Sequence, residues 1–487
     1  CIRDRCTRRP EDAARVVAAR SIGRMVAAPE RSLLSGFGLA TPSAATVVDV
    51  AVDPAEAHPL DELRAAIKGL PARGGIARGL GRSYGDPAQS AGGHVIRLAS
   101  HPGSIALDHE AGTVTVGAGV SIDQLLRVIV PRGWFVPVTP GTRFVTIGGA
   151  IASDIHGKNH HVDGSFGRYV TRLRMMLADT SVVEIAPDRD PELFWATVAG
   201  MGLTGVVIDA TVRLLPIETS RVSVDTYRLG HLDDVMSEMV ASEAASRYSV
   251  AWIDLLATGR HRGRGVLTNG NHAVAAQLDA RSAADPLGYD ADGIISVPPL
   301  VPPAGVINTA SVKLFNEAWY RRAPRNRHGE LQSIPAYFHP LDGVGHWNRV
   351  YGRQGFVQYQ FVVPETADDV MRTAIERLSA ARLPIFLVVL KRFGPGTPAP
   401  LSFPTSGWQL AVDVGARHRQ LPGVLAELDR LVLDAGGRHY FAKDLQTTPA
   451  AIRRGYPRLD EWQRTRRRVD PDGVWASDLS RRLGLTP

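Results

Sequence analysis

Glycines, hydroxyl groups, histidines and a lysine crowd into one short segment of this chain, residues 140–161. The paired glycines Gly148 and Gly149 let a backbone approach a ligand without a Cβ in the way, and successive N–H groups in such turns form a concave anion site. His156 and Lys158 add an imidazole and an ammonium to the same segment. This mixture predicts a site for a phosphate-bearing cofactor.

A second glycine loop lies upstream, at residues 77–86. The segment 140–161 taken alone is also compatible with an ordinary glycine-rich loop, and its pairing with the upstream loop favours the ligand site. Gly79, Gly81 and Gly85 have GxGxxxG spacing, which differs from the GxGxxG fingerprint of nicotinamide-binding folds. No strong helix is predicted after them. A nicotinamide-binding Rossmann site is therefore not expected.

Short strands alternate with helices around these loops. Residue periodicity predicts strands at 46–52, 76–78, 94–98, 104–107, 112–117 and 205–215. It predicts helices at 60–70, at 121–130 with Ser121 as N-cap, and from Pro191 onward. A hairpin is expected over 173–178 and 181–185. Beyond a boundary near 216–220, helices alternate with β-rich runs at 247–254 and 355–363, and the apolar run 383–390 is expected to be a buried strand.

The bulk properties limit the class of protein. A chain of 487 residues is too long for one compact core and predicts two or three domains. Cys1 and Cys6 are the only cysteines, so no disulfide framework or cysteine metal site supports the fold. The longest apolar runs are too short to span a bilayer, and no clean secretory signal is evident near the start. The proline- and glycine-rich span 286–306 is expected to be an irregular loop or lid.

Arginine accounts for an uneven excess of positive charge. Lys plus Arg number 56 and Asp plus Glu number 49, and both ends of the chain are rich in arginine. Such clusters bind nucleic acid or anionic lipid, or simply form a solvated surface. Few aromatic residues are interleaved with them, so a nucleic-acid-binding protein is the weakest hypothesis and no nucleic-acid partner is expected. The histidines His156, His160 and His161 lack an accompanying carboxylate motif, and no metal is expected.

Several motifs carry a family resemblance. Three segments in this order resemble the FAD domain of the vanillyl-alcohol-oxidase class of flavoproteins: 77–86, 140–161 and 194–205. Residues 141–160 are similar to sugar and aldonolactone oxidases within that class. Four further motifs resemble the decaprenylphosphoryl-β-D-ribose 2-oxidase family: Tyr337–Asp342, Phe356–Phe361, Pro400–Pro404 and Tyr440–Asp444. The resemblance runs from about Leu33 to Leu485.

The resemblance implies an α+β fold in parts. A two-part PCMH-type FAD-binding domain, with mixed and antiparallel sheets plus helices, is expected over residues 33–217. An α+β substrate domain built on an antiparallel sheet is expected over 218–435. Residues 436–487 are expected to return to the FAD-binding domain, and residues 1–32 to form a flexible tail.

The resemblance also implies a set of residues around FAD. They are Ala77, Arg78, Gly79, Leu80, Gly81, Arg82, Ser83, Tyr84, Gly85, Asp86, Pro87, Gly141, Thr146, Ile147, Gly148, Gly149, Ser153, Asp154, Ile155, His156, Val207 and Tyr440. Backbone donors in glycine loops suit a pyrophosphate, and apolar residues suit a flavin ring. Covalent members of the wider class often have a histidine in the first loop. This chain has Arg82 there, so non-covalent FAD is expected.

Catalytic and substrate residues follow from the same resemblance. Lys443 is expected to be the polar catalytic group, because burial near other cations lowers a lysine pKa toward a useful range. Tyr84 and His156 are expected beside it. Lysines hold phosphate and glutamines pair with sugar hydroxyls, so the substrate side is expected to comprise Lys158, Gln358, Gln360, Lys391, Phe393 and Gln409.

The implied reaction oxidises the ribose 2-hydroxyl of decaprenylphosphoryl-β-D-ribose, or of a related polyprenyl-phosphoryl ribose, to the 2-keto sugar. A partner keto-reductase would complete the 2-epimerisation to the arabinose donor for actinobacterial cell-wall arabinan. A lipid-linked substrate implies peripheral association with a membrane surface, on a face that the sequence leaves open. The alternative is an FAD-dependent oxidase of a small soluble sugar, alditol or aldonolactone. Gln409 and Ala411 depart from family members that have Asn and Cys there, which leaves the substrate open.

Overall fold

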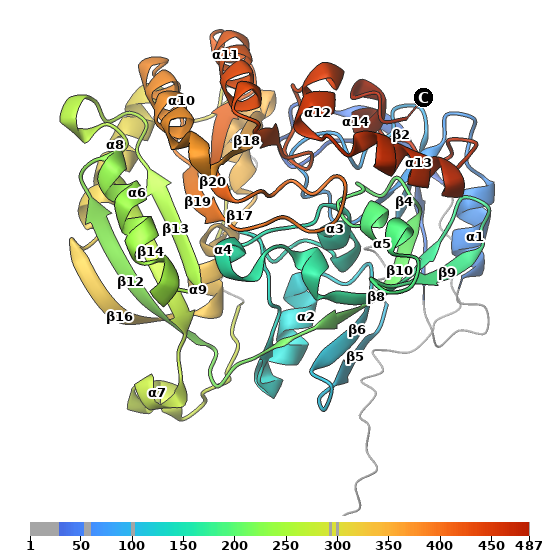
Figure 1. Cartoon of the computed structure of the whole chain (residues 1–487), viewed down its shortest axis with the longest axis horizontal. Helices are drawn as coiled ribbons and strands as arrows, with labels where there is room; N and C mark the ends of the chain where they lie inside the picture. The colour runs from blue at the N-terminus through green and yellow to red at the C-terminus, as the bar shows by residue number, and fades with distance from the viewer. Residues whose placement is uncertain (1–28, 53–59, 99–102, 292–294, 299–300, 487) are drawn as a thin grey trace, which may run out of the picture.

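The computed structural model describes residues 29–52, 60–98, 103–291, 295–298 and 301–486. Most of the predicted tail lies outside these ranges, and β1 (Glu30–Leu34) is the first described element. Figure 1 shows two bodies of sheet and helix side by side, joined along the middle of the molecule.

The first body begins with a four-stranded sheet in the order β1-β2-β4-β3. Strands β2 and β3 both run parallel to β4, whereas β1 is antiparallel to β2. The bounds of the other elements here are Ser43–Asp49 for β2, Gly75–Arg78 for β3, His94–Arg97 for β4 and Asp61–Lys68 for α1. Helix α1 buries Leu63, Ala66 and Ile67, which are spaced as one apolar helix face.

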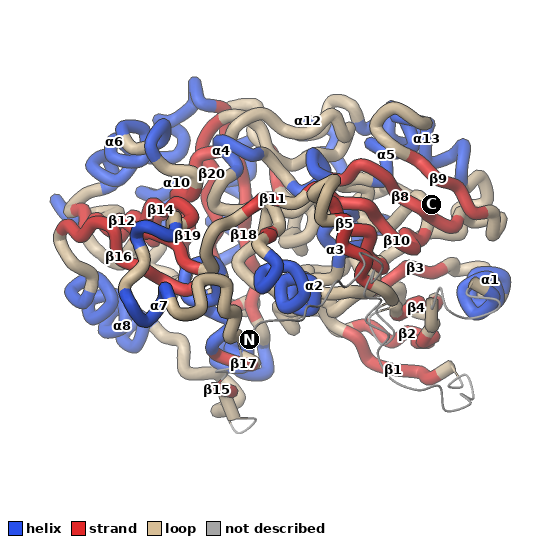
Figure 2. The backbone as a smooth tube through the Cα atoms, turned by 90° about the horizontal axis from the view of Figure 1, so that it is seen from below, coloured by secondary structure: helices blue, strands red, loops and turns tan. Residues whose placement is uncertain are grey.

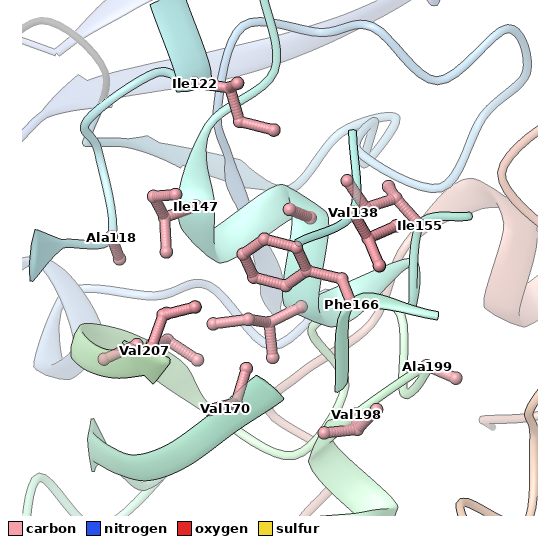
Figure 3. Close-up of a cluster of buried hydrophobic side chains, with 14 of the residues drawn as sticks. Ala118, Ile122, Val138, Ile147, Ile155, Phe166, Val170, Val198, Ala199 and Val207 are labelled. Carbon is pink, nitrogen blue, oxygen red and sulfur yellow. The ribbon is translucent and has the colours of Figure 1, made fainter. Parts of the chain in front are cut away.

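The same body has a five-stranded antiparallel sheet in the order β5-β6-β10-β8-β9. Its strands are Ile105–Asp108 (β5), Thr113–Gly117 (β6), Val170–Met176 (β8), Val182–Ile185 (β9) and Val206–Arg213 (β10). The associated helices are Ile122–Ile129 (α2), Ile147–Ala152 (α3), His160–Asp163 (α4) and Pro191–Thr197 (α5). Figure 3 shows the apolar cluster in which α3 packs on this sheet, with Ala118, Ile147, Phe166 and Val207 among its members.

The second body is built on an eight-stranded sheet in the order β16-β12-β14-β13-β19-β20-β18-β21. The strands are Arg221–Leu229 (β12), Tyr248–Ile253 (β13), Gly265–His272 (β14), Asn326–Ser333 (β16), Phe356–Pro364 (β18), Val388–Phe393 (β19), Gly407–Gly415 (β20) and Arg438–His439 (β21). All its pairings are antiparallel.

Helices cover one face of that sheet. The apolar sides of Leu232–Ala241 (α6), Asp368–Ala380 (α10) and Leu421–Asp434 (α11) join the alternate strand residues in one core. Figure 1 shows these helices outside the sheet, away from the first body. The other helices of this part are Ala280–Ala283 (α7), Thr309–Arg322 (α8) and Ile334–Phe338 (α9). The opposite sheet face is turned toward the first body.

Two small pairs complete the strands. Trp134–Phe135 (β7) pairs with Leu215–Pro216 (β11), and Ile295–Ser296 (β15) pairs with Val344–Gly345 (β17). The second pair lies at the lower rim in Figure 2.

The end of the chain returns to the first body. Figure 1 shows α12 (Pro449–Gly455), α13 (Leu459–Val469) and α14 (Asp478–Arg482) beside the N-terminal elements. The indole of Trp462 donates a hydrogen bond to the Ala196 carbonyl at 2.9 Å, and Trp475 packs in the core of the first sheet. The first body is therefore made from both ends of the described chain.

The α+β class with mixed and antiparallel sheets is confirmed. The predicted cap of α2 is also found, since Ser121 accepts a hydrogen bond from the Gln124 amide at 3.2 Å. The strand predicted over 383–390 is wrong in its first half, because β19 begins only at Val388. Pro384 lacks an N–H for strand pairing, and an apolar run alone does not distinguish a strand from a buried extended segment. None of the described helices combines the length and apolar character that a bilayer crossing requires.

Candidate active site

Alternation along β18, β19 and β20 gives the eight-stranded sheet two different faces. Tyr359 and Phe361 point into the helix-covered core, so Gln358 and Gln360 point the other way. Antiparallel pairing sets Gln358 opposite Asp413 and Lys391 opposite Gln409. We call this second side the polar face; it comprises Gln358, Gln360, Lys391, Gln409 and Asp413.

The polar face meets the segment 140–161 at His156. The Gln360 amide nitrogen lies 2.8 Å from His156 Nε2. The imidazole is surrounded by the rings of Phe393 and Tyr440, each with its centroid 4.9 Å away, and of Phe403 at 5.5 Å. Burial and the nearby Lys391 charge hold the pKa of His156 well below its usual value, so the ring is neutral. Its Nδ1 is buried with no hydrogen-bond partner among the described residues.

Lys443 lies against Tyr84 of the first glycine loop. Its ammonium nitrogen is 3.5 Å from the centroid of the Tyr84 ring, and the Tyr84 amide donates a hydrogen bond to the Ala442 carbonyl at 2.9 Å. Burial lowers the pKa of Lys443, while the Asp413 carboxylate opposes that shift and the Lys391 charge adds to it. The lowered pKa brings the Lys443 amine closer to the pKa that acid–base catalysis at neutral pH requires than the amine of a surface lysine would be.

Asp413 is a functional candidate that the sequence analysis missed. It is fully buried on β20, and Gln358 donates a hydrogen bond to its Oδ1. Its Oδ2 has no hydrogen-bond partner within the part of the chain that the structure describes. Burial raises the pKa of Asp413, and the charge of Lys443 acts against that rise. A carboxylate in the otherwise apolar run Leu410–Val414 was the available signal.

Two further lysines complete a group of cations. Lys158 donates a hydrogen bond to the Tyr337 carbonyl and lies 4.0 Å from the centroid of the Tyr337 ring. Burial, with a contribution from Lys391, lowers the pKa of Lys158 to about 7. Burial lowers the pKa of Lys391 to about 8. Lys391 contributes to the shifts of Lys158, His156 and Lys443, so the structure brings these four predicted residues together.

The two glycine loops pack on each other through atoms that leave no room for a side chain. A Cβ on Gly79 would lie 2.2 Å from Thr146 Oγ1, which itself accepts a hydrogen bond from the Gly149 amide at 3.2 Å. A Cβ on Gly85 would lie 2.1 Å from the Asp444 carbonyl oxygen. These glycines therefore serve close backbone packing between the loop 77–87, the segment 140–161 and the Lys443 turn.

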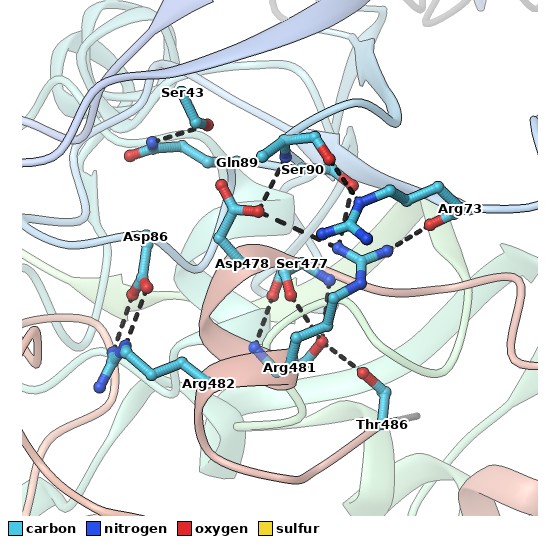
Figure 4. Close-up of polar contacts among 12 residues, drawn as sticks. Ser43, Arg73, Asp86, Gln89, Ser90, Ser477, Asp478, Arg481, Arg482 and Thr486 are labelled. Carbon is cyan, nitrogen blue, oxygen red and sulfur yellow. Dashed lines mark hydrogen bonds and ion pairs between the residues drawn. The ribbon is translucent and has the colours of Figure 1, made fainter.

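An arginine clamp holds the first loop against the Lys443 turn. Arg482 of α14 donates to both carboxylate oxygens of Asp86, at 2.9 and 3.0 Å, and to Asp444 Oδ2 at 2.9 Å. Figure 4 shows the Asp86–Arg482 pair beside the neighbouring contacts of Arg481 and Ser477. The Asp86 side chain is thus bound to protein, and its backbone carbonyl accepts hydrogen bonds from the Gln89 and Leu479 amides at 3.3 and 3.4 Å.

Three more predicted cofactor residues have side chains turned toward protein. The buried Asp154 carboxylate accepts hydrogen bonds from Ser165, Gly167, Thr397 and Ser402. Arg78 donates to the carbonyls of Ala88 and Ser35. Val207 is buried in the apolar cluster of Figure 3. In the same way, the Tyr440 hydroxyl donates to the Ser153 carbonyl at 2.8 Å, which ties the two segments together.

Other atoms along these loops fit an FAD molecule. A Cβ on Gly141 would meet nothing within 4 Å, and the apolar side chain of Leu80 is 43% exposed. Arg82 lies over the rings of Phe37 and Phe144, and its buried Nε has no partner among the described residues. Unpaired polar atoms beside apolar surface are what the heterocycle and polar edge of a flavin require.

Comparison with known proteins agrees with this chemistry. Residues 55–186 match a family model described as an FAD binding domain, and residues 421–483 match one described as D-arabinono-1,4-lactone oxidase. A decaprenylphosphoryl-beta-D-ribose oxidase of Mycolicibacterium smegmatis is 44% identical over 93% of this chain and 97% of its own length. An uncharacterized Streptomyces coelicolor protein is 39% identical over 75% of this chain and 100% of its own, and an alditol oxidase of a Streptomyces species is 26% identical over 84% of this chain and 90% of its own.

The chain is therefore an FAD-dependent oxidoreductase, with the FAD-binding domain that the family resemblance implied. The chain belongs to the family of the decaprenylphosphoryl-beta-D-ribose oxidase of M. smegmatis, since the match covers nearly all of both proteins. Among the described residues, no group of three or more His, Cys, Asp or Glu side chains is arranged to hold a metal ion.

Proposed function

We propose that the enzyme oxidises the ribose 2-hydroxyl of decaprenylphosphoryl-β-D-ribose, or of a closely related polyprenyl-phosphoryl ribose, to the 2-keto sugar. The M. smegmatis relative is named for oxidation of this class of substrate. The observation that carries the proposal is the grouping of Lys158 and Lys443 around Lys391 of the polar face, with Lys443 in contact with Tyr84 of the first glycine loop. A phosphorylated sugar has the charge and the hydroxyl groups to use such a group.

FAD, when bound, supplies the acceptor for the hydride that leaves the sugar carbon. We propose that the residues of the two glycine loops hold it, with Gly141 and Gly148–Gly149 providing close backbone approach. Tyr440 and His156 would lie along the same pocket. The protonated guanidinium of Arg82 is a poor nucleophile toward a flavin ring, which supports non-covalent binding.

The hydroxyl proton needs an acceptor in the protein, and Lys443 is the proposed one. Its lowered pKa makes the neutral amine accessible near neutral pH. Asp413 would adjust the pKa of that amine, because its negative charge favours the protonated form of Lys443 and the Lys443 charge favours the ionised form of Asp413. Tyr84 holds the Lys443 ammonium against its ring, and burial raises the pKa of Tyr84 well above its usual value, so the phenol stays protonated.

The substrate is proposed to bind on the polar face. Lys158 and Lys391 would hold its phosphate, and Gln358 and Gln360 would bind ribose hydroxyls. Gln409 lies opposite Lys391 on the neighbouring strand and has both amide atoms buried without a partner among the described residues. We propose that it and Phe393 contact the sugar or its phosphate.

The wider context is also proposed. The oxidised sugar would pass to a partner keto-reductase, and the pair would complete the 2-epimerisation that yields the arabinose donor for cell-wall arabinan. A substrate with a long lipid supports peripheral association with a membrane. We further propose an FAD-binding domain at 33–217, a substrate domain at 218–435 and a C-terminal segment at 436–487 that completes the first.

Anaerobic flavin reduction tests the proposal directly. Polyprenyl-phosphoryl ribose is expected to bleach the flavin absorbance, whereas free ribose, alditols and aldonolactones are expected to leave it unchanged. The match to the lactone-oxidase model and the alditol oxidase makes a small-polyol oxidase the second candidate. Bleaching by a free alditol or lactone, with peroxide released on re-oxidation, would support that candidate instead.

A further inference from the structure

Exposed apolar side chains gather on one helix of the second body. Of the large apolar residues that remain exposed, α8 carries Leu314 (74%), Phe315 (44%) and Trp319 (46%), and Val306 (47%) shortly precedes it. At 100° per residue the three helix positions share an arc of about 140°, while the buried Val312 and Asn316 lie beyond it. We call Val306, Leu314, Phe315 and Trp319 the α8 surface. Contiguous exposed apolar groups of this kind mark an interaction site.

The net charge of α8 is positive. Glu317 is its only carboxylate, and that group pairs with Arg321 and Arg264 at 2.5 Å. Lys313 and Arg322 are exposed, and in the described ranges neither forms an ion pair. Within one helix, tryptophan, leucine and phenylalanine thus sit beside unpaired cations. This composition is typical of helices that lie in the interface of an anionic membrane.

A series of aromatic rings connects the α8 surface with the active site. Phe315 contacts Phe386 with centroids 5.6 Å apart, and Phe386 lies 6.1 Å from Tyr351. Tyr351 stacks on Phe356 at 4.4 Å, and Phe356 lies 5.2 Å from Tyr84. Tyr84 is the residue under Lys443. The apolar surface of α8 is therefore continuous, through packed rings, with the wall of the site.

A second exposed apolar point lies on the same rim. Ile295 is 81% exposed and Val344 is 40% exposed on the β15–β17 pair. Figure 2 shows this pair and α8 along the lower edge of the molecule in that view. Two separated contacts on one edge suit a flat partner such as a bilayer better than a narrow peptide.

We propose that the α8 surface seats the enzyme on an anionic phospholipid bilayer, with Leu314 and Trp319 inserted among the headgroups and Lys313 and Arg322 on the phosphates. This proposal rests on the proposed function, because a substrate with a polyprenyl chain resides in the bilayer. Seating at α8 would bring the aromatic series, and hence the sugar-binding side, to the lipid from which the substrate comes.

Co-sedimentation of the FAD-loaded, full-length enzyme with vesicles tests whether the α8 surface binds an anionic bilayer. Wild type is expected to bind phosphatidylglycerol-containing vesicles and to release them in high salt, with much weaker binding to phosphatidylcholine alone. The double variants L314Q/W319Q and K313Q/R322Q are each expected to reduce partitioning about tenfold. Val240→Gln, at an exposed valine of α6 that is 50% accessible, is the matched control and is expected to bind like wild type.

A soluble short-chain prenylphosphoryl ribose separates this proposal from the proposed function. All variants are expected to show wild-type flavin reduction with it in the absence of vesicles. If wild type is not reduced by it, the proposed function fails whatever the vesicles show. If wild type is reduced but both double variants still bind vesicles normally, the α8 seat is wrong. Loss of a dimer in L314Q/W319Q, with unchanged vesicle binding, would also overturn it and assign the surface to a second copy of the chain.

Discussion

Both faces of the eight-stranded sheet contain fully buried side chains, but the two faces are chemically opposite. On the helix-covered face, Phe361 and Leu410 are fully buried among apolar side chains of α10 and α11. On the polar face, Gln409 and Asp413 are just as buried but keep unpaired polar atoms among the described residues. Apolar burial stabilises a fold, whereas an unpaired buried polar atom costs stability. The comparison shows that this sheet separates apolar packing from unpaired polar groups by side, residue by residue along the same strands.

The largest effect is expected from removing Lys443, the proposed proton acceptor beside the polar face. Lys443→Met should lower the rate of flavin reduction about 10²- to 10⁴-fold, because no amine then accepts the hydroxyl proton. Rapid-mixing absorbance under anaerobic conditions gives this rate directly. Since burial lowers the pKa of Lys443, the wild-type rate should fall as the pH decreases through that lowered pKa, and the variant should lack this acidic limb.

A surface lysine provides the control for that change. Lys68→Met alters an exposed residue of α1 and should leave the rate unchanged. The flavin content of each purified variant, read from its visible spectrum, separates loss of chemistry from loss of FAD. A Lys443→Met variant that retains FAD and reacts at the wild-type rate would remove Lys443 from the mechanism.

The apolar side should show the reverse pattern. Leu410→Ala leaves a cavity among α10, α11 and the strands, and should lower the free energy of unfolding by about 2–5 kcal/mol. The flavin-reduction rate of the folded variant should stay within about twofold of wild type, because Leu410 points away from the polar face. Urea unfolding measures the first quantity. Leu33→Ala, at a leucine that is 71% exposed, should change stability little, and a similar loss there would refute the cavity explanation.

Local sequence patterns predicted the separation of the apolar and polar faces only in part. Alternation along a strand at 355–363 is enough to put Gln358 and Gln360 on one face, and glycine spacing predicted the loops, because both signals depend on neighbouring residues. The pairing of Arg482 with Asp86 joins residues 396 positions apart, and no local pattern encodes it. The same holds for Asp413 and Lys443, which only tertiary packing brings into mutual influence. Family resemblance supplied Lys443, but the partner that tunes it came from the structure.

Replacing Lys391 tests whether the buried groups of the polar face lower the stability of the fold. Burial lowers the pKa of Lys391 to about 8, and no hydrogen bond or ion pair to its ammonium is found in the described ranges. Lys391→Met should therefore raise the free energy of unfolding near pH 6 by on the order of 1–3 kcal/mol. The gain should shrink as the pH rises above about 8, where the native wild-type amine is already neutral while the unfolded one still binds a proton.

The same variant should lose substrate affinity. A phosphate group needs the cationic form, so the wild-type KM for the lipid phosphate should rise with pH above about 7 to 8, the pKa values of Lys158 and Lys391. Lys391→Met should start from a higher KM at pH 6. A variant that is less stable than wild type and binds substrate normally would show that Lys391 is structural.

Replacing Gln409 is expected to give the smallest change in stability. It is also the most direct test of the comparison, because the neighbours of Gln409 on β20 belong to the other face. Gln409→Met keeps a similar chain length and removes two buried amide atoms that lack partners among the described residues. The free energy of unfolding should rise by about 1–2 kcal/mol, opposite in sign to Leu410→Ala one residue away. If Gln409 binds the sugar, its KM should rise severalfold while the maximal rate of flavin reduction changes little. Stabilisation with an unchanged KM would leave Gln409 outside the substrate site; destabilisation would mean that the polar face is packed as tightly as the apolar one, and the separation by side would not hold.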